Sequence, residues 1–307
     1  MKLASIDIGT NSMRLLIADY EGSFKTRKKM VNITRIGKGV DSEGYISKEA
    51  MDYNLDALKE FVDIAKGESC EDIYVMGTSA LRDSKNKEEF QTEAMKKAGV
   101  KVDIITGSDE ASLGFYGVVA GLKEQTEILV IDIGGGSTEF VVGDPTAGIQ
   151  FMKSENVGSV RMTEKFVESD LMTDLEYSAI RNYVKEVIAD TMRIIKTHNI
   201  KRVIGIGGTA TTLSSMVQEL DNYDMEKVHG SRVSIEDLKY TIEKLMGLTL
   251  EERMKIKGLQ PKRADVITAG LIILEVILEK LGMDYIEVSE YDNLEGLIYE
   301  KSKCKSS

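Results

Sequence analysis

Apolar residues at the start of the chain form two runs, separated by a short turn that contains Gly9. The first run covers residues 3–8 and carries an Asp-x-Gly sequence at its end, and the second covers residues 13–20. Two apolar runs joined by a tight glycine-containing turn predict a β-hairpin. A third strand is predicted over residues 30–36, so the chain begins with three strands.

The spacing of apolar residues then changes to the period of a helix. Helix and strand alternate from here, with a strand predicted over 73–76, a helix over 87–98, a strand over 102–106 and a helix over 109–119. The first of the helices is indicated by Ala50, Leu55, Leu58, Phe61, Val62 and Ala65.

The second half of the chain repeats this order. A hairpin is predicted over residues 129–143, and a third strand follows over 149–153. The later elements are a helix over 175–198, a strand over 202–206, a helix over 264–281, a strand over 285–288 and a C-terminal helix. Strands followed by alternating helices and strands indicate an α/β fold, in which helices cover both faces of a mixed sheet.

Particular residues also recur between the two halves. Residues 75–81 resemble residues 206–213. Together with the hairpin match, this predicts two copies of one domain. A polar stretch places the boundary between residues 124 and 125, giving domains over 1–124 and 125–307, with the last helix able to pack back on the first domain. The matching hairpin positions, all 125 residues apart, are Asp7 with Asp132, Gly9 with Gly134 and Ser12 with Ser137.

Composition narrows the classes of function. The 307 residues include 40 Lys and Arg and 51 Asp and Glu, which gives a net charge of −11. An acidic chain lacks the basic face that sequence-independent binding of nucleic acid needs, so we exclude nucleic acid as a partner. The length allows two domains of about 150 residues, each with its own core.

Few residues are available for thiolate or imidazole chemistry. Cys70 and Cys304 lie far apart in the sequence, so they cannot form a disulfide framework or a thiolate metal cluster. His198 and His229 are the two histidines, which excludes a three-histidine zinc site. We expect His229 to make a loop contact rather than to act as a base.

The sequence has no pattern typical of a targeting or membrane segment. Asp7 lies where a signal peptide needs an apolar core. The apolar stretch 270–278 contains Glu275 and is too short to cross a bilayer. We therefore expect a soluble, cytoplasmic protein with no membrane partner, for which a homodimer is compatible with the sequence.

The two glycine-containing turns suggest binding of phosphate. Glycine lets backbone N–H groups approach an anion closely, and Ser and Thr hydroxyls add donors. The alternative is a pair of ordinary hairpin turns in which glycine supplies a positive φ, but duplication of the turn favours phosphate. A third candidate is Gly207 with Gly208, which follow the strand over 202–206 and open a helix. The candidate residues of the turns are Gly9, Thr10, Asn11, Ser12, Gly134, Gly135, Gly136, Ser137 and Thr138.

Acidic residues beside the turns suggest a magnesium site. Asp7 and Asp132 end buried apolar strands, where a carboxylate is costly unless it is paired, hydrogen-bonded or bound to metal. Mg²⁺ takes one or two carboxylates together with water and phosphate oxygens. Glu139 lies on the strand that leaves the second turn and is a further candidate ligand, the alternative being a solvated strand residue.

Four motifs in this order resemble the Ppx/GppA family of exopolyphosphatases and guanosine pentaphosphate phosphohydrolases. They are Asp7-Ile-Gly9-Thr-Asn-Ser12, Gly77-Thr-Ser-Ala-Leu-Arg82, Thr106-Gly107-Ser-Asp-Glu110-Ala111 and Asp132-Ile-Gly-Gly-Gly-Ser-Thr-Glu139. The resemblance covers essentially the whole chain. It implies two duplicated actin-like (ribonuclease H-like, ASKHA) domains with mixed five-stranded sheets and an interdomain cleft. The chain departs from the family pattern at residues 288–296, which lack the Gly-Leu-Arg that usually precedes Glu-Gly.

The resemblance also implies roles for individual residues. Glu110 is similar to the family's catalytic glutamate, which activates water, and Arg82 to its phosphate-contacting arginine. Asp132, Gly134, Ser137 and Glu139 are similar to its phosphate- and Mg²⁺-handling residues. The residues alone favour a different explanation of Glu110: Ser108 is a good N-cap, and acids at positions 109 and 110 suit the positive end of a helix.

The expected activity is Mg²⁺-dependent hydrolysis of the terminal phosphate of inorganic polyphosphate, with Glu110 activating water and Glu139 and Arg82 assisting. Another divalent ion, or help from K⁺, is also compatible. The alternative substrate is guanosine pentaphosphate, which would lose its 5′ γ-phosphate. An ATP-dependent small-molecule kinase and a non-catalytic alarmone sensor are the other two classes considered. Residues that could guide a polyanion, or simply form a solvated face, are Lys25, Arg27, Lys28, Lys29, Arg161 and Arg232.

Overall fold

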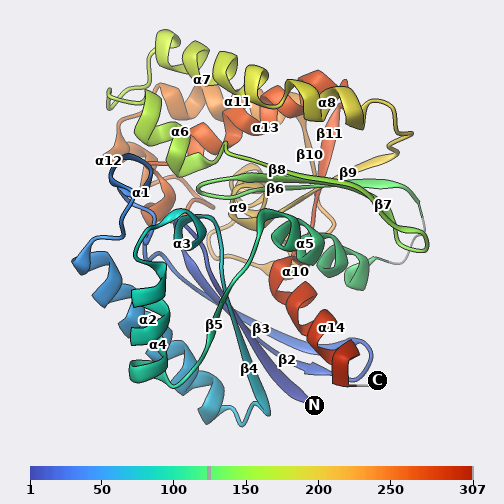
Figure 1. Cartoon of the computed structure of the whole chain (residues 1–307). Helices are drawn as coiled ribbons and strands as arrows, with labels where there is room; N and C mark the ends of the chain where they lie inside the picture. The colour runs from blue at the N-terminus through green and yellow to red at the C-terminus, as the bar shows by residue number, and fades with distance from the viewer. Residues whose placement is uncertain (123–125, 306–307) are drawn as a thin grey trace. The chain divides into compact units, whose positions relative to one another are not determined.

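The computed structural model describes residues 1–122 and 126–305 (Figure 1). Contacts between residues divide the chain into two compact units. The first unit is Met1–Ala120 together with Tyr291–Ser307, and the second is Gly121–Glu290. The boundary predicted between residues 124 and 125 lies outside the described residues.

The first unit contains a mixed sheet of five strands in the order β3-β2-β1-β4-β5. Strands β1 (Lys2–Ile8), β2 (Met13–Tyr20) and β3 (Phe24–Asn32) form an antiparallel meander. Strands β4 (Asp72–Gly77) and β5 (Val102–Ile104) continue the sheet in parallel with β1. The sheet therefore begins with hairpins and ends with crossover connections, as the sequence predicts.

Helices cover both faces of this sheet. Figure 1 shows α2 (Lys48–Gly67) and α4 (Lys87–Ala98) on one side, and α5 (Gly107–Gly121) and α14 (Asn293–Lys305) on the other. Side chains of β1 alternate between these faces, because successive residues of a strand point to opposite sides. One face carries Ala4, Ile6 and Ile8 into the core beneath α2 and α4, while Leu3 packs with α14 residues.

Two glycines allow α5 and α14 to approach closely. A Cβ atom on Gly117 would collide with the carbonyl of Asp292, and one on Gly296 would collide with the carbonyl of Leu113. Such backbone-to-backbone contact requires residues without side chains. The C-terminal helix is thus a component of the first unit.

The second unit repeats the strand order with one addition. Its sheet runs β10-β11-β9-β6-β7-β8. Here β6, β7 and β8 form the antiparallel meander, and β9 and β11 extend it in parallel. This order confirms the duplicated fold with two mixed sheets, the arrangement expected of actin-like domains. The bounds are β6 Ile128–Ile133, β7 Thr138–Asp144, β8 Gly148–Glu155, β9 Arg202–Ile206, β10 Arg232–Ser234 and β11 Tyr285–Val288.

The sixth strand of this sheet, β10, corrects the expected count of five. It has three residues and pairs antiparallel with β11 at the edge of the sheet. A run this short is too brief to show a two-residue period in the sequence. Its pairing with β11 depends on tertiary contacts between segments about 50 residues apart.

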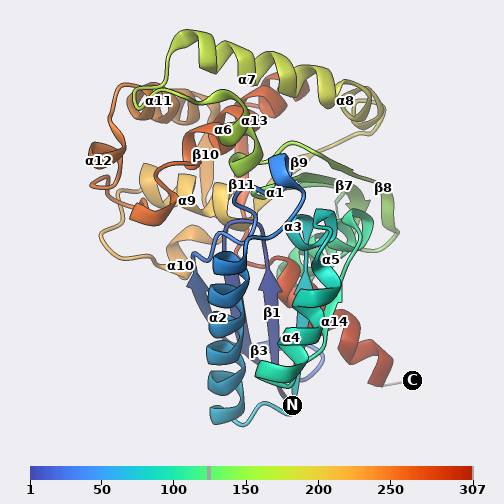
Figure 2. The same cartoon turned by 60° about the vertical axis from the view of Figure 1, so that its left-hand side comes forward.

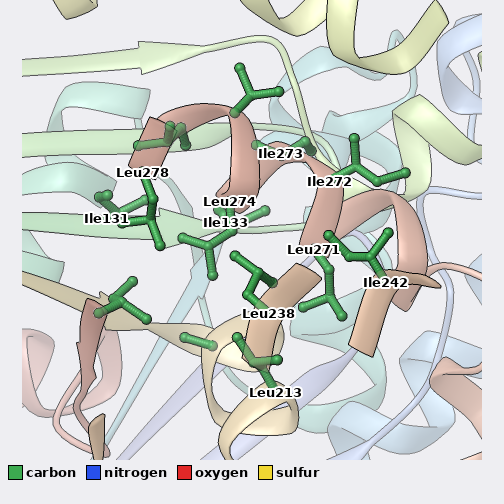
Figure 3. Close-up of a cluster of buried hydrophobic side chains, with 14 of the residues drawn as sticks. Ile131, Ile133, Leu213, Leu238, Ile242, Leu271, Ile272, Ile273, Leu274 and Leu278 are labelled. Atoms are coloured by element: carbon green, nitrogen blue, oxygen red, sulfur yellow. The ribbon is translucent and has the colours of Figure 1, made fainter. Parts of the chain in front are cut away.

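A nearly fully buried helix, α13 (Ile267–Leu281), forms the centre of the second unit. Figure 2 shows α6, α7, α11 and α13 gathered on one side of the second sheet. Figure 3 shows Leu271 and Leu274 of α13 near Leu238 of α11 and Ile133 of β6. The other α-helices of this unit are α6 Ser159–Phe166, α7 Asp174–Val187, α8 Ala189–Ile195, α9 Gly207–Val217, α10 Met225–Val228, α11 Ile235–Met246 and α12 Leu250–Arg253. The first unit also contains α1 Val40–Glu43 and α3 Ser79–Asp83.

Two predicted elements differ from the structure. The strand predicted over 30–36 corresponds to β3, which covers Phe24–Asn32. Its true start was missed because an edge strand with charged residues on both faces lacks the alternation of apolar residues that marks a strand. The helix predicted over 175–198 is two helices, α7 and α8, which meet at Ile188. Within the described ranges, no helix combines the length and the apolar composition needed to cross a bilayer.

Candidate functional site

The two Asp-x-Gly turns close in the same way. The amide of Gly9 donates to the carbonyl of Ser12 at 3.0 Å, and the amide of Gly134 donates to the carbonyl of Ser137 at 3.0 Å. These four residues are the ones that the 125-residue repeat aligns. The repeat in sequence is therefore also a repeat in hydrogen bonding.

In the first unit, a neighbouring loop binds the carbonyl groups of the turn. Arg35 N donates to Asn11 O at 3.0 Å, and Gly37 N donates to Thr10 O at 2.9 Å. A Cβ atom on Gly37 would collide with the methyl group of Thr10, so glycine is required at this position. Residues 35–37 therefore hold the turn in place by hydrogen bonds to its carbonyl groups. Residues 35 and 36 were predicted to be the end of a strand.

Two buried polar atoms at this turn lack a hydrogen-bond partner within the described part of the chain. They are Nδ2 of Asn11 and Oδ1 of Asp7. Asn11 is 8% exposed and Asp7 is 4% exposed. A buried polar atom without a partner costs about 1–3 kcal/mol, and such an atom often marks the place of a water, an ion or a ligand.

In the second unit, the start of α6 binds the carbonyl groups of the turn. Ser159 N donates to Gly134 O and Val160 N to Gly135 O, both at 2.9 Å. Arg161 Nε donates to Gly136 O at 2.8 Å, so this arginine, considered as a guide for polyanions, supports the turn. Among the described residues, the amides of Gly135 and Gly136 have no hydrogen-bond acceptor. These two N–H groups are suitable donors for an anion.

Thr138 does not present its hydroxyl to a ligand in this structure. Its Oγ1 donates to Val157 O at 2.6 Å, and the residue is fully buried. The hydroxyl therefore ties β7 to the segment that precedes α6. The role of Thr138 in phosphate binding stays a prediction, and its side chain has a partner within the protein.

The aspartates of the two turns face different partners. In the first hairpin, Asp7 lies opposite Arg14 in the register of β1 and β2. In the second, Asp132 lies opposite Glu139 in the register of β6 and β7. The first pair is a cation with an anion, whereas the second consists of two carboxylates. Asp7 and Asp132 are equivalent in sequence but not in electrostatic environment.

Arg14 holds one oxygen of Asp7 and connects it to the start of α14. Its Nη2 and Nε lie 2.6 and 3.1 Å from Oδ2 of Asp7, and its Nη1 lies 2.7 Å from Oδ2 of Asp292. Burial raises the pKa of Asp7, and the charge of Arg14 offsets part of that effect. Burial would also raise the pKa of Asp292, but the charges of Arg14 and Lys29 hold it well below its usual value. Arg14 was not among the predicted site residues, although its position 125 residues before Glu139 was a usable signal.

Asp132 and Glu139 are both enclosed by the second unit. A Cβ atom on Gly207 would collide with Oδ1 of Asp132, and Gly207 has a φ of 73°. Glu139 is 2% exposed, and its Oε1 accepts a hydrogen bond from Ser154 at 2.7 Å. The described residues contain no group of three or more His, Cys, Asp and Glu side chains suited to a metal ion. A metal here would therefore rely on one or two carboxylates.

The start of α9 lies against Arg263, a residue of the 3₁₀ helix Pro261–Arg263 for which no role was predicted. A Cβ atom on Gly208 would collide with the guanidinium of Arg263, so this group lies directly on the backbone of Gly208. Thr209 Oγ1 donates to Ile133 O at 2.8 Å and fixes the start of α9 to the end of β6. The predicted glycines at 207 and 208 thus lie beside Asp132 and Arg263, respectively.

Arg82 and Glu110 form an ion pair in the first unit. Nη1 of Arg82 lies 3.1 Å from Oε2 of Glu110, and the same nitrogen donates to Ile105 O at 3.2 Å. Glu110 is 8% exposed and the side chain of Arg82 is 22% exposed. Two of the three predicted catalytic residues, 28 positions apart in sequence, are therefore in contact.

The helix that carries Glu110 is capped by other residues. Thr106 Oγ1 accepts a hydrogen bond from Asp109 N at 3.1 Å, and Oδ2 of Asp109 accepts from Thr106 N at 3.1 Å and from its hydroxyl at 2.7 Å. This reciprocal pair is a capping box. It replaces the cap expected at Ser108 and uses Asp109, so capping does not explain the acid at position 110.

Two residues of the basic run of β3, Arg27 and Lys29, bind carboxylates of the protein. Arg27 Nη1 lies 3.0 Å from Oε1 of Glu295, and Lys29 Nζ lies 3.1 Å from carboxylate oxygens of both Asp292 and Glu295. The side chains of Arg27 and Lys29 are 12% and 11% exposed. These two residues hold the N-terminus of α14.

Two further basic candidates, Lys28 and Arg232, and His229 also have partners in the protein. Lys28 pairs with Glu68 at 2.9 Å on the opposite face of β3, and Arg232 stacks on Tyr285. Nδ1 of His229 accepts a hydrogen bond from the amide of Glu290 at 3.3 Å. This is the loop contact expected for His229.

The sequence of the chain is similar to that of known proteins. A model of the Ppx/GppA phosphatase family matches residues 16–304. The chain is 39% identical over 310 residues to a bifunctional 3-dehydroquinate synthase/phosphatase of Fusobacterium nucleatum, with 97% of this chain and 46% of that protein covered. It thus spans about half the length of that relative.

Two further proteins are similar over nearly their whole lengths. Exopolyphosphatase 2 of Mycobacterium tuberculosis is 34% identical over 311 residues, with 96% of this chain and 97% of that protein covered. The crystal structure of an exopolyphosphatase from Cytophaga hutchinsonii superposes with a TM-score of 0.90 at 30% identity, covering 99% of this chain and 98% of that one. These matches confirm the resemblance and the fold: the chain belongs to the Ppx/GppA phosphatase family and is an enzyme of the phosphatase class.

Proposed function

We propose that this protein is an exopolyphosphatase, which hydrolyses the terminal phosphoanhydride bond of inorganic polyphosphate. The observation that carries the proposal is the contact between Arg82 and Glu110 at 3.1 Å. It combines a guanidinium suited to phosphoryl oxygens with a carboxylate suited to activating water. The relative from Mycobacterium tuberculosis, which matches almost end to end, is named an exopolyphosphatase.

In the proposed reaction, Glu110 orients the attacking water and accepts its proton. The bond from Arg82 to Oε2 fixes the orientation of the carboxylate. Arg82 also offsets the negative charge of the phosphoryl oxygens, which is the main task of catalysis in phosphoryl transfer. The oxygen of water forms the new bond to phosphorus, and the bridging oxygen leaves with the shortened chain.

Donors in both turns are available for the remaining phosphoryl oxygens. The amides of Gly135 and Gly136 supply two donors in the second unit, and Nδ2 of Asn11 supplies one in the first.

We further propose that Mg²⁺ is held by Asp132 and Glu139. Two carboxylates opposite one another in register repel unless a cation or a proton lies near them. Mg²⁺ commonly binds through one or two carboxylates together with substrate phosphates, so the lack of a larger cluster among the described residues is compatible with it. When bound, the ion would neutralise charge on the phosphate chain. Asp7 fits less well, because Arg14 already compensates its charge.

The substrate is tested by measuring phosphate release from polyphosphate and from guanosine pentaphosphate at equal concentrations of terminal phosphate. We expect the higher kcat/KM with polyphosphate. A higher value with guanosine pentaphosphate would replace the proposed substrate with the nucleotide. Turnover of neither compound in the presence of Mg²⁺, Mn²⁺ or K⁺ would refute the proposed activity.

Two other classes of protein predict different outcomes, which assays of phosphate transfer from ATP and of nucleotide binding would detect. A kinase would transfer the γ-phosphate of ATP to an added sugar or acid rather than to water. A sensor would bind a guanine nucleotide tightly without turnover, and loss of Glu110 would not change that binding.

A further inference from the structure

The polar side chains at the carboxyl ends of β1 and β4 include a serine that has no role in the site described above. Ser79 is the first residue of α3 (Ser79–Asp83) and is 3% exposed. Its Oγ has no hydrogen-bond partner within the described part of the chain. A buried hydroxyl of this kind is unfavourable unless something outside the protein satisfies it.

Ser79 lies beside the first phosphate-binding turn. Thr78 N donates to Ile8 O at 3.2 Å, which joins the residue before Ser79 to the end of β1. A Cβ atom on Gly37 would meet both the methyl group of Thr10 and the Cβ of Ala80. One glycine therefore contacts the turn on one side and the residue after Ser79 on the other.

Ser79 also shares a face of α3 with Arg82. Residues three positions apart on a helix are neighbours on its surface. Arg82 in turn contacts Glu110 at 3.1 Å. Ser79 is thus placed between the turn that carries Asn11 and the Arg82–Glu110 pair.

The unpartnered atoms in this region have complementary chemistry. Nδ2 of Asn11 is a donor, and Oγ of Ser79 can donate its proton. Both groups are suited to binding anionic oxygens. Ser79 is the first residue of α3, the helix that also carries Arg82. From this arrangement we propose that Ser79 is a further phosphate-binding residue, whose hydroxyl donates to a phosphoryl oxygen held by the first unit. This inference rests on the proposed function, because it concerns the same substrate class.

Ser84 provides a matched control at the other end of α3. It is also buried, at 2% exposed, but its Oγ donates to Leu81 O at 3.0 Å. The two serines therefore differ in whether the protein itself satisfies the hydroxyl. Alanine is smaller than serine, so both alanine variants fit the space that the serine side chains occupy.

The experiment compares wild type, Ser79→Ala and Ser84→Ala. Thermal unfolding is measured with and without inorganic tripolyphosphate, in the absence of divalent cations, and KM is measured with polyphosphate. For Ser79→Ala we expect an unchanged or higher Tm without ligand, a smaller stabilisation by tripolyphosphate, and a KM about tenfold higher, because a hydrogen bond to a charged oxygen is lost. For Ser84→Ala we expect a lower Tm without ligand and an unchanged KM.

Equal stabilisation by tripolyphosphate of wild type and Ser79→Ala would overturn the inference. A second comparison uses Ser79→Thr, which keeps the hydroxyl, and Ser79→Val, which has the shape of threonine without the hydroxyl. Equal binding of tripolyphosphate by these two variants would also overturn the inference. Failure of the proposed function has a different signature, since wild type would then bind tripolyphosphate without releasing phosphate from polyphosphate. Wild type that binds tripolyphosphate neither without divalent cations nor with Mg²⁺ would refute both.

Discussion

Arg14 in the first hairpin and Glu139 in the second occupy equivalent positions, each opposite the aspartate of its own Asp-x-Gly turn. The duplication has therefore kept the backbone while reversing the charge beside the aspartate. Asp7 is compensated by a guanidinium at 2.6 Å, whereas Asp132 has a second carboxylate as its neighbour. This asymmetry gives the two turns different electrostatic surroundings, and it is the reason for proposing Mg²⁺ in the second unit.

The first prediction concerns that cation. Replacing one carboxylate of a two-carboxylate site weakens binding of Mg²⁺. For Glu139→Gln we expect the Mg²⁺ concentration at half-maximal activity to rise about tenfold, the direction that loss of an anionic ligand implies. Titration of phosphate release with Mg²⁺ measures this. The control is Asp144→Asn at the far end of the same strand, and an unchanged titration curve for Glu139→Gln would remove Glu139 from the metal site.

A second prediction separates two neighbouring acids on α5. For Glu110→Gln we expect kcat to fall by about 10²–10⁴-fold, the usual contribution of general acid–base catalysis, with stability little changed. For Asp109→Asn we expect a loss of about 0.5–2 kcal/mol in the free energy of unfolding, because it weakens the capping box with Thr106, and little change in kcat. Phosphate-release kinetics and chemical unfolding of both variants test this pair. Near-normal turnover by Glu110→Gln would contradict the assignment.

The third prediction concerns Gly207, which makes a close approach to Asp132. Gly207→Ala combines an unfavourable φ of 73° with a collision against Oδ1 of Asp132. Gly282→Ala combines a φ of 68° with open space around the added methyl group. We expect both variants to lose about 1 kcal/mol of stability from the backbone, and only Gly207→Ala to lose activity as well. If Gly282→Ala lost as much kcat/KM as Gly207→Ala, contact with Asp132 would not be the cause.

A fourth prediction concerns the pH dependence of stability through Asp292. The folded protein holds the pKa of this carboxyl below its usual value, since the attraction of Arg14 and Lys29 exceeds the effect of burial. An acid whose pKa is lower in the folded than in the unfolded state adds stability above its unfolded pKa, and this stability is lost as the pH falls toward the folded pKa. We therefore expect the free energy of unfolding to fall below about pH 4, the usual pKa of Asp.

Asp292→Asn tests this assignment. The variant removes the titrating group, so its free energy of unfolding should be lower near neutral pH and should change less between about pH 5 and pH 3. Urea unfolding at a series of pH values measures both curves. Parallel curves for the variant and wild type would show that Asp292 does not control this part of the acid dependence.

Most of the local structure was predictable from the sequence. The hairpins follow from apolar runs around glycine turns, and the helix over 87–98 and the strand over 202–206 have the bounds that the pattern predicts. These elements depend on hydrogen bonds and side-chain periods within a few residues, so a short stretch of sequence contains the necessary information. The exceptions include the ends of the charged strand β3 and three elements that were not predicted, namely the very short strand β10 and the helices α6 and α11.

The sequence by itself determined the duplication, the α/β class and the residue types at the two turns. Each of these follows from local patterns of residues or from the constant spacing of 125 residues between the two halves. The tertiary structure alone decided which charges meet: Arg82 with Glu110, Arg14 with Asp292, and Lys29 with the start of α14. Arg14 and Asp292 are 278 positions apart. Local periodicity holds no information about such a pair, because the contact exists only once the sheet and the C-terminal helix have packed together.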